Sequence, residues 1–377
     1  MDGLATLESL QPTGSDDGVE TILARSGLDL AGSDLAGSDL AGLDLAGLDL
    51  AGLDLAGQSA LGGSAEAFPS LAADMPIRFG RVRQHTLRNP ISCVGVGLHT
   101  GRTIRLTLRP APVDSGIVFH RVDLGIRMPA RHDMVIDTRL STVIASREQP
   151  EARIATVEHV MAALAGCLID NAIIEVDGPE IPVLDGSAAP FVFLLDCAGR
   201  QEQQGARSMI EVLRRIRVED GAAFAELRPA TQPCLSLSLS IAFPARAIGR
   251  QACSMTLTDR AFRNEVADCR TFTMLGEIEA LRASGLARGG SLDNAVVVDD
   301  ARVLNPAGLR RRDEFVRHKL LDAIGDLALA GQPIRGAFIG HRSGHGLNNR
   351  LLHALLSDSS AWRLSGRGVL PDVSLAA

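Results

Sequence analysis

The amino-acid sequence predicts an α+β fold built from two blocks of similar size. Segments of strand and helix character mix along residues 76–360 without the strict strand-helix-strand repeat of a parallel α/β sheet. The chain has 377 residues, enough for two ordinary domains that each bury a core. We place the first block at residues 76–204 and the second at 205–360, followed by a C-terminal tail at 361–377.

In the first block, apolar and polar side chains alternate over residues 104–108, which predicts a strand that ends at Pro110. Residues 172–176 predict another strand, and the apolar run 157–167 between them predicts a helix with Thr156 as its N-cap. The second block opens with a strand at 209–212. Its other predicted elements are a strand at 234–243, a helix at 275–283, a strand at 295–298, a helix at 314–324, a strand at 336–340 and a helix at 347–356.

The first 75 residues differ from the rest because they carry thirteen acidic side chains and one basic one. A five-residue unit, (Leu/Ser)-Asp-Leu-Ala-Gly, repeats six times over residues 28–57 and resembles the pentapeptide-repeat pattern. In that pattern the central leucines would point into a square β-helix, but repeat stacks need several neighbours to bury a core. We favour a disordered or partner-dependent acidic tail over a short β-helix, with a linker at 58–73.

Charge and composition exclude several classes of function. The net charge of -7 becomes about +5 once the -12 of residues 1–75 is subtracted, which suits an anionic substrate but is too small for a nucleic-acid-binding protein. The apolar run 160–169 is about half a membrane-spanning length, and no secretory signal is apparent. Six scattered cysteines indicate reduced thiols. We therefore expect a cytoplasmic protein with no integral membrane segment and no nucleic-acid partner.

The only lysine of the chain, Lys319, marks a candidate site, since the other 37 basic residues are arginines. It lies in the predicted helix 314–324, where His318, Asp322 and Asp326 recur every four residues on one stripe. An imidazole and a carboxylate one turn apart, roughly 6 Å along the axis, can bind one metal ion. A solvated polar face with pairs four residues apart is the alternative.

A second candidate motif is the pair Glu158-His159 at the start of the predicted helix 157–167. Zinc hydrolases use a glutamate beside a metal-binding histidine, one to handle a proton and the other to bind the ion. Together with His318 and Asp322, His159 would give two imidazoles, one carboxylate and an open position, as in catalytic zinc sites. The alternative is an ordinary Glu-His pair at the edge of a core.

Residues 77–360 carry, in order, a series of motifs that resemble the UDP-3-O-acyl-N-acetylglucosamine deacetylase family of lipid A biosynthesis. The motifs are Gly95-Val96-Gly97-Leu98-His99-Thr100-Gly101, Ser141-Thr142, the helix that starts Thr156-Val157-Glu158-His159, Ile169-Asp170-Asn171, the segment 179–191, Arg270-Thr271-Phe272, the segment 289–295, the helix with Lys319, and Ser343-Gly344-His345-Gly346-Leu347-Asn348-Asn349. The first 75 residues lie outside this resemblance.

The resemblance implies two similar α+β domains, each a small sheet with helices against it, and the helices of both meeting between the sheets. It also implies a short strand insert in the first domain and a βαβ insert near residues 272–299 in the second. The active site would lie between the domains.

The resemblance also assigns roles to residues. His159, His318 and Asp322 would bind Zn²⁺, with Fe²⁺ as the alternative metal, and Glu158 would act as general base. His345, oriented by Asp326, would stabilise the oxyanion and supply a proton, and Thr271 would donate a hydroxyl. Lys319 and His99 would contact substrate, and Leu98, Phe272, Gly290 and Leu292 would border a passage for an acyl chain; ordinary core packing is the alternative for these four.

The sequence thus predicts a zinc amidase that removes acetate from a UDP-3-O-(3-hydroxyacyl)-N-acetylglucosamine. A zinc hydrolase of another N-acyl sugar and a non-catalytic regulator that binds acyl-sugar nucleotides are the alternatives. For the acidic tail, charge and repetition suggest a protein partner.

Overall fold

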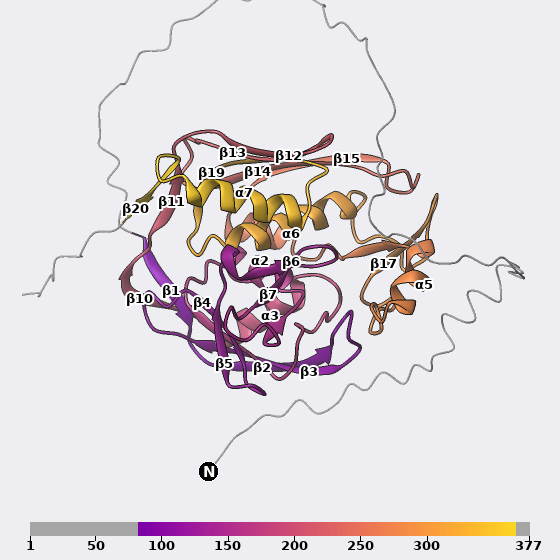
Figure 1. Ribbon diagram of the computed structural model, residues 1–377, viewed down its shortest axis with the longest axis horizontal. Coiled ribbons are helices and arrows are strands. Elements are labelled where there is room, and N and C mark those ends of the chain that lie inside the picture. The colour runs from indigo at the N-terminus through magenta and orange to yellow at the C-terminus, as the bar shows by residue number, and fades with distance from the viewer. Residues whose placement is uncertain (1–81, 367–377) are drawn as a thin grey trace, which may run out of the picture. The chain divides into compact units, whose positions relative to one another are not determined.

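The computed structural model describes residues 82–366, which belong to one compact unit. The acidic repeat and linker that we predicted for residues 1–75 fall outside the described residues, as does the segment 367–377 of the predicted C-terminal tail. Mixed sheets and helices confirm the α+β class (Figure 1).

The first half is built on a five-stranded sheet in the order β2 (Ile91–Val96), β3 (Thr103–Pro110), β9 (Ala172–Val176), β4 (Ile117–Arg121) and β5 (Ile126–Pro129). Neighbouring strands are antiparallel except β4 and β9. In β3 the expected alternation is present, since Ile104, Leu106 and Leu108 are fully buried while Thr103 and Arg105 are exposed. Helices α2 (Glu158–Gly166) and α3 (Ala189–Ala198) belong to this half.

Smaller elements complete the first half. Strand β1 (Arg83–Leu87) pairs with β10 (Arg200–Ala206). A three-stranded insert of β6 (Val135–Asp137), β7 (Val143–Ala145) and β8 (Arg153–Ile154) follows the 3-10 helix η1 (His132–Met134). This insert carries Leu140 and Thr142, which reach the site described below.

The second half is built on a seven-stranded sheet. Its main path is β12 (Ile216–Asp220), β13 (Ala223–Arg228), β19 (Ile334–His341), β11 (Met209–Val212) and β20 (Trp362–Ser365), while β14 (Leu235–Ala242) pairs with β19 and with β15 (Arg250–Thr256). Every second residue of β14, beginning with Leu235, is buried, as its period of two predicts. Residues 362–365, placed in the C-terminal tail from the sequence, form β20 because they pair antiparallel with β11.

Helices α6 (Glu314–Ala328) and α7 (His345–Ser357) pack against this sheet, whereas α4 (Asp259–Glu265) of the same half contacts α2. A separate unit of β16 (Phe272–Met274), α5 (Leu275–Ala283), β17 (Val296–Asp299) and β18 (Arg302–Val303) projects to one side in Figure 1. Because β16 and β17 are parallel and joined through α5, this unit has βαβ connectivity.

The two sheets enclose a helical layer in which α2 packs against α6 (Figure 1). All residues of α2 except Ala165 are buried, so this helix has no solvent face. Gly325 of α6 makes the close approach possible, because a Cβ at this position would lie 2.7 Å from the carbonyl carbon of Glu158. The helix pair therefore brings the start of α2 next to the middle of α6.

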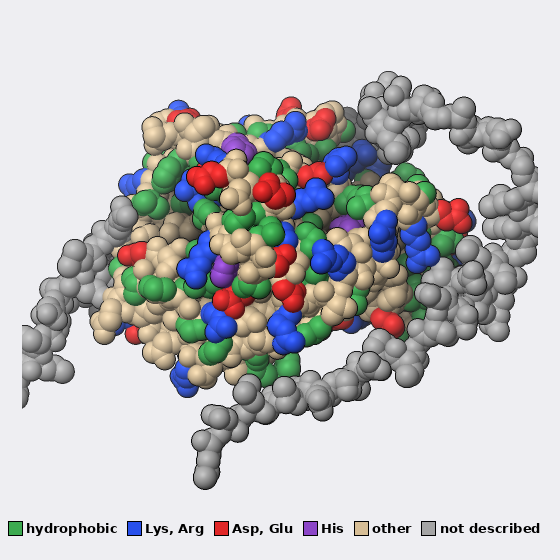
Figure 2. Space-filling view, turned by 60° about the horizontal axis from the view of Figure 1, so that its bottom comes forward, with side chains coloured by type: hydrophobic (Ala, Val, Ile, Leu, Met, Phe, Trp, Pro, Cys, Tyr) green, Lys and Arg blue, Asp and Glu red, His purple; other side chains and the backbone are tan. Residues whose placement is uncertain are grey.

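The charges on the surface and the length of the helices bear on whether the protein binds nucleic acid or membranes. On the face drawn in Figure 2, basic and acidic side chains are interspersed rather than gathered by sign. Within residues 82–366, the helices are too short or too polar to cross a membrane.

Candidate metal centre and active site

Three side chains converge where α2 meets α6. His159 is the second residue of α2, and His318 and Asp322 lie one turn apart on α6. The Nε2 atoms of His159 and His318 lie 3.5 and 3.3 Å from Oδ1 of Asp322. All three residues are at most 3% exposed. Their potential ligand atoms lie within 4.8 Å of one another, so one ion can contact all three.

The chemistry of this cluster fits a divalent metal ion. Oδ1 of Asp322 is buried and has no hydrogen-bond partner among the described residues. His318 Nδ1 lies 3.0 Å from the Cys269 carbonyl oxygen, to which it donates, so the lone pair of Nε2 faces the cluster. Burial lowers the pKa of His318 to about 4 and keeps the imidazole neutral, as a ligand must be. Two imidazoles and one carboxylate form a donor set typical of catalytic metal sites.

Glu158, the first residue of α2, lies beside the cluster and is 3% exposed. Its Oε2 accepts a hydrogen bond from the backbone N–H of Thr142 at 3.0 Å. Its Oε1 lies 4.0 Å from Nε2 of His345. Burial raises the pKa of this carboxyl, although the neighbouring histidines oppose the shift. Glu158 is thus a fixed carboxyl group with one oxygen available for proton transfer.

The metal cluster opens into a hollow, which is also lined by Glu158, His345, Lys319, Leu140, Phe243, Thr271 and Phe272. His345 begins α7 and faces Glu158 across this hollow. Its Nδ1 lies 2.9 Å from Oδ2 of Asp326. Asp326 is itself held by the Thr142 hydroxyl at 2.6 Å and by the Asn348 amide at 2.8 Å. Burial alone would lower the pKa of His345, but Asp326 outweighs it and raises this pKa to about 9. The imidazole is therefore protonated at neutral pH.

Lys319 also lies in the hollow, and its ammonium group donates to Oδ2 of Asp322 at 2.8 Å. Burial alone would raise the pKa of Asp322, but His318 and Lys319 lower it well below its usual range. The lysine that we expected to contact substrate is therefore held by a metal-ligand candidate. The 21% exposure of its side chain still leaves it accessible from the hollow.

The remaining predicted site residues divide into two groups. Thr271 and Phe272 line the hollow together with Leu140 and Phe243, and Phe272 packs edge-to-face on Phe243 at 5.5 Å. Leu98, His99, Gly290 and Leu292 do not line this hollow. Instead, the Leu98 and His99 carbonyls accept backbone hydrogen bonds from Gly289 and Arg288, which joins the two loops.

Sequence reasoning gave no role to Thr142 or Asn348, which orient Glu158 and Asp326. Both residues occur in motifs that carry the family resemblance, and that was the available signal. The prediction for Thr156 was wrong, because Thr156 has a φ of +60° and helix α2 begins after Val157 with no side-chain cap. Its hydroxyl instead hydrogen-bonds to the buried Glu180 at 3.3 Å.

Comparison with known proteins identifies the family. Residues 84–357 match the family model described as UDP-3-O-acyl N-acetylglycosamine deacetylase. The chain belongs to this deacetylase family. The match covers both halves of the fold and every residue of the cluster, and it confirms the resemblance seen in the sequence.

Members of this deacetylase family from three bacteria are similar to this chain along most of their own length. A UDP-3-O-acyl-N-acetylglucosamine deacetylase of Phenylobacterium zucineum is 51% identical over 284 residues, which cover 74% of this chain and 96% of the relative. Deacetylases with the same name from an Anaeromyxobacter species and Acidithiobacillus ferrooxidans are each 50% identical, over 74% of this chain and 91% and 92% of their own length.

Proposed function

We propose that this chain hydrolyses the 2-acetamido group of a UDP-3-O-(3-hydroxyacyl)-N-acetylglucosamine, releasing acetate and the free amine for lipid A biosynthesis. The observation that carries the proposal is the buried His159, His318 and Asp322 cluster, flanked by Glu158 on one side and His345 on the other. The names of the similar deacetylases support the choice of substrate.

The metal that His159, His318 and Asp322 would hold is Zn²⁺, with Fe²⁺ as the alternative. Both imidazole nitrogen and carboxylate oxygen are ligands of Zn²⁺, and a protein with three such ligands leaves one position open. When bound, Zn²⁺ lowers the pKa of its water to about 7 and polarises a carbonyl group. Metal analysis of the purified protein distinguishes zinc from iron.

Glu158 acts as the general base. Oε2 is engaged by the Thr142 N–H, so Oε1 is the atom that accepts the proton of the attacking water. The leaving nitrogen then takes up a proton, either the one now on Glu158 or the Nε2 proton of His345, which lies 4.0 Å from Oε1.

His345 stabilises the negative charge that develops on the carbonyl oxygen of the acetamide. Its pKa of about 9 keeps Nε2 protonated, and the hydrogen bond of Nδ1 to Asp326 fixes the ring. The hydroxyl of Thr271, which borders the same hollow, is the second donor to this oxygen.

Substrate binding is proposed to use the rest of the hollow. Lys319 contacts sugar or phosphate oxygens from its exposed side, and Phe272 opens the apolar passage for the acyl chain. Leu98, Gly290 and Leu292 extend this passage beyond the hollow, at the junction between the loop 97–101 and the βαβ unit, and His99 of the same loop contacts substrate. The excess of about five positive charges after residue 75 suits a diphosphate.

One experiment separates this proposal from its two alternatives. Acetate release is measured from the acyl-UDP-sugar and from other N-acetyl sugars, each before and after removal of the metal by a strong chelator. The proposal predicts release from the acyl-UDP-sugar that is lost on chelation and restored by Zn²⁺. Faster release from another sugar favours the first alternative, and binding without release favours a regulator.

We also propose that the chain acts in the cytoplasm and that residues 1–75 bind a protein partner. All six cysteines are free, which agrees with a reducing compartment. The second proposal rests on the repeat and on the net charge of -12. Deletion of residues 1–75 is expected to leave turnover intact and to abolish co-purification of the partner; unchanged partner recovery and abundance would refute it.

A further inference from the structure

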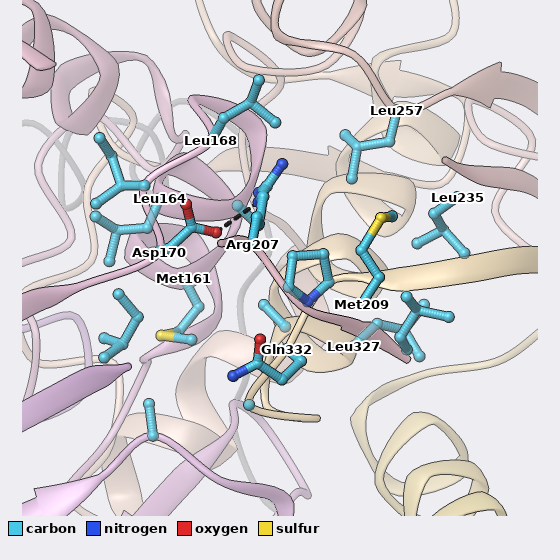
Figure 3. Close-up of a pocket in the computed structure, with 18 of the residues that line it drawn as sticks. Met161, Leu164, Leu168, Asp170, Arg207, Met209, Leu235, Leu257, Leu327 and Gln332 are labelled. Atoms are coloured by element: carbon cyan, nitrogen blue, oxygen red, sulfur yellow. Dashed lines mark hydrogen bonds and ion pairs between the residues drawn. The ribbon is translucent and has the colours of Figure 1, made fainter. Parts of the chain in front are cut away.

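A second cavity lies between the two halves of the structure, away from the metal cluster (Figure 3). Its walls include Met161 and Leu164 of α2, Ile324 and Leu327 of α6, and Leu235 at the start of β14. It shares no lining residue with the hollow that contains His159, Asp322 and Glu158. The catalytic chemistry proposed above therefore makes no use of it.

The wall of this cavity is suited to an aliphatic chain. The buried part is lined by leucine, isoleucine, methionine and alanine side chains. Its volume is about 130 Å³, similar to the roughly 150 Å³ aliphatic cavity that binds benzene and excludes water. Binding of an apolar ligand is favourable here, because it removes this apolar surface from water.

One edge of the cavity carries a charged group with unused hydrogen-bonding capacity. Arg207 donates from Nε to Oδ1 of Asp170 at 2.6 Å, and Oδ2 of Asp170 accepts from the backbone N–H of His85 at 2.8 Å. The Arg207 side chain is 13% exposed. Its two terminal NH₂ groups have no hydrogen-bond partner within residues 82–366. Figure 3 shows this guanidinium among the labelled apolar side chains.

The carboxylates at this edge are already engaged as acceptors. Asp170 accepts from Arg207 Nε and from the His85 N–H, and Asp114 accepts from the Gln84 amide at 2.7 Å, so the terminal NH₂ groups of Arg207 stay available as donors. A guanidinium fork presents parallel N–H groups that match the two oxygens of a carboxylate. Figure 3 labels three polar side chains in the wall of the cavity, Asp170, Arg207 and Gln332, and Gln332 is the uncharged one.

We propose that this cavity binds a straight-chain aliphatic carboxylate, with the chain between α2 and α6 and the carboxylate on the NH₂ groups of Arg207. By comparison with the cavity that binds six-carbon benzene, the volume corresponds to a chain of about six carbons. This site goes beyond the proposed deacetylation and does not depend on it. Its occupant would contact both helices that carry the metal-ligand candidates.

The test is calorimetric titration of the full-length, metal-loaded protein with butyrate, hexanoate, octanoate and decanoate. We expect one site per chain, with affinity rising about fourfold per methylene, the equivalent of about 0.8 kcal/mol, until the cavity is full. The increase should stop near hexanoate. No saturable binding, or a steady increase beyond decanoate, would overturn the proposal.

Variants locate the ligand. Leu257→Trp fills the rim of the cavity from a half-buried position and should abolish octanoate binding. Arg207→Gln should weaken octanoate about tenfold while leaving 1-octanol unchanged, because only the carboxylate uses the guanidinium. Arg121→Gln is the matched control, since Arg121 is also a buried arginine paired with an aspartate, Asp123, but lies outside the cavity.

Two results would count against the cavity. If Arg207→Gln weakened the binding of octanoate and of 1-octanol equally, the arginine would have only a structural role. Loss of binding in Phe272→Ala together with unchanged binding in Leu257→Trp would place the carboxylate in the metal-containing hollow. Circular dichroism spectra of the variants exclude unfolding as the cause of any loss.

Discussion

Gly325→Ala is expected to disrupt the metal centre without touching a ligand. The new Cβ would lie 2.7 Å from the carbonyl carbon and 3.0 Å from the Cα of Glu158, whereas ordinary contacts begin at 3.4 Å. The helices must separate by at least the difference between 3.4 and 2.7 Å, about 0.7 Å. Metal–ligand distances tolerate only about ±0.2 Å. His159, next to Glu158, would therefore move out of bonding range of an ion held by His318 and Asp322.

The expected effect is large and can be measured directly. We predict zinc affinity about 10- to 100-fold weaker, turnover about 100-fold lower, and a cost of about 1–3 kcal/mol in the free energy of unfolding. Zinc affinity is measured by competition with a chromophoric chelator and turnover by acetate release.

Gly276→Ala is the matched control for this substitution, because Gly276 lies in helix α5 and a Cβ there meets no atom within 4 Å. It should be neutral or raise the free energy of unfolding by about 0.4–1 kcal/mol. Wild-type zinc affinity and turnover in Gly325→Ala would refute the close-packing argument.

Three further substitutions test individual roles. Glu158→Gln should keep the metal and lower turnover about 10²- to 10⁴-fold, since the amide cannot accept the proton; an unchanged rate would exclude it as the base. Above the His345 pKa of about 9, loss of its proton should lower the rate, so His345→Ala should lower turnover and remove this basic limb of the pH profile; an unaltered profile would exclude His345. Lys319→Arg should weaken zinc affinity and turnover about tenfold, because the fork cannot reproduce the 2.8 Å contact with Asp322; normal kinetics would show that the two cations are interchangeable here.

Local patterns predicted the elements that carry the site. The stripe of His318, Asp322 and Asp326 follows from helical periodicity, and α6 has these residues buried on one helix as the spacing predicts. The strands β3 and β14 follow from alternation in the same way. Each of these predictions depends on residues close together in the sequence, because the backbone of a single helix or strand fixes which of its side chains share a face.

Long-range contacts could not be predicted from those patterns. Thr142 and Asp326 are 184 residues apart, and no local signal says that their side chains meet. For Thr156 the local signal was misleading, because the distant Glu180 offers its hydroxyl a partner that competes with helix capping. The ligand set of catalytic zinc sites suggested that His159 joins His318 and Asp322, and family resemblance agreed, but spacing alone could not show that the two helices meet.

The three metal-ligand candidates come from both halves of the chain. His159 belongs to the first half and His318 to the second, so a bound ion would join positions 159 residues apart along the chain. An ion that binds only the folded protein adds about 2.7 kcal/mol at a concentration of 100 times its Kd, and this energy is lost as soon as either half unfolds. The ion therefore adds a second link between the two halves to the packing of α2 on α6, and its removal should lower the temperature at which they unfold together.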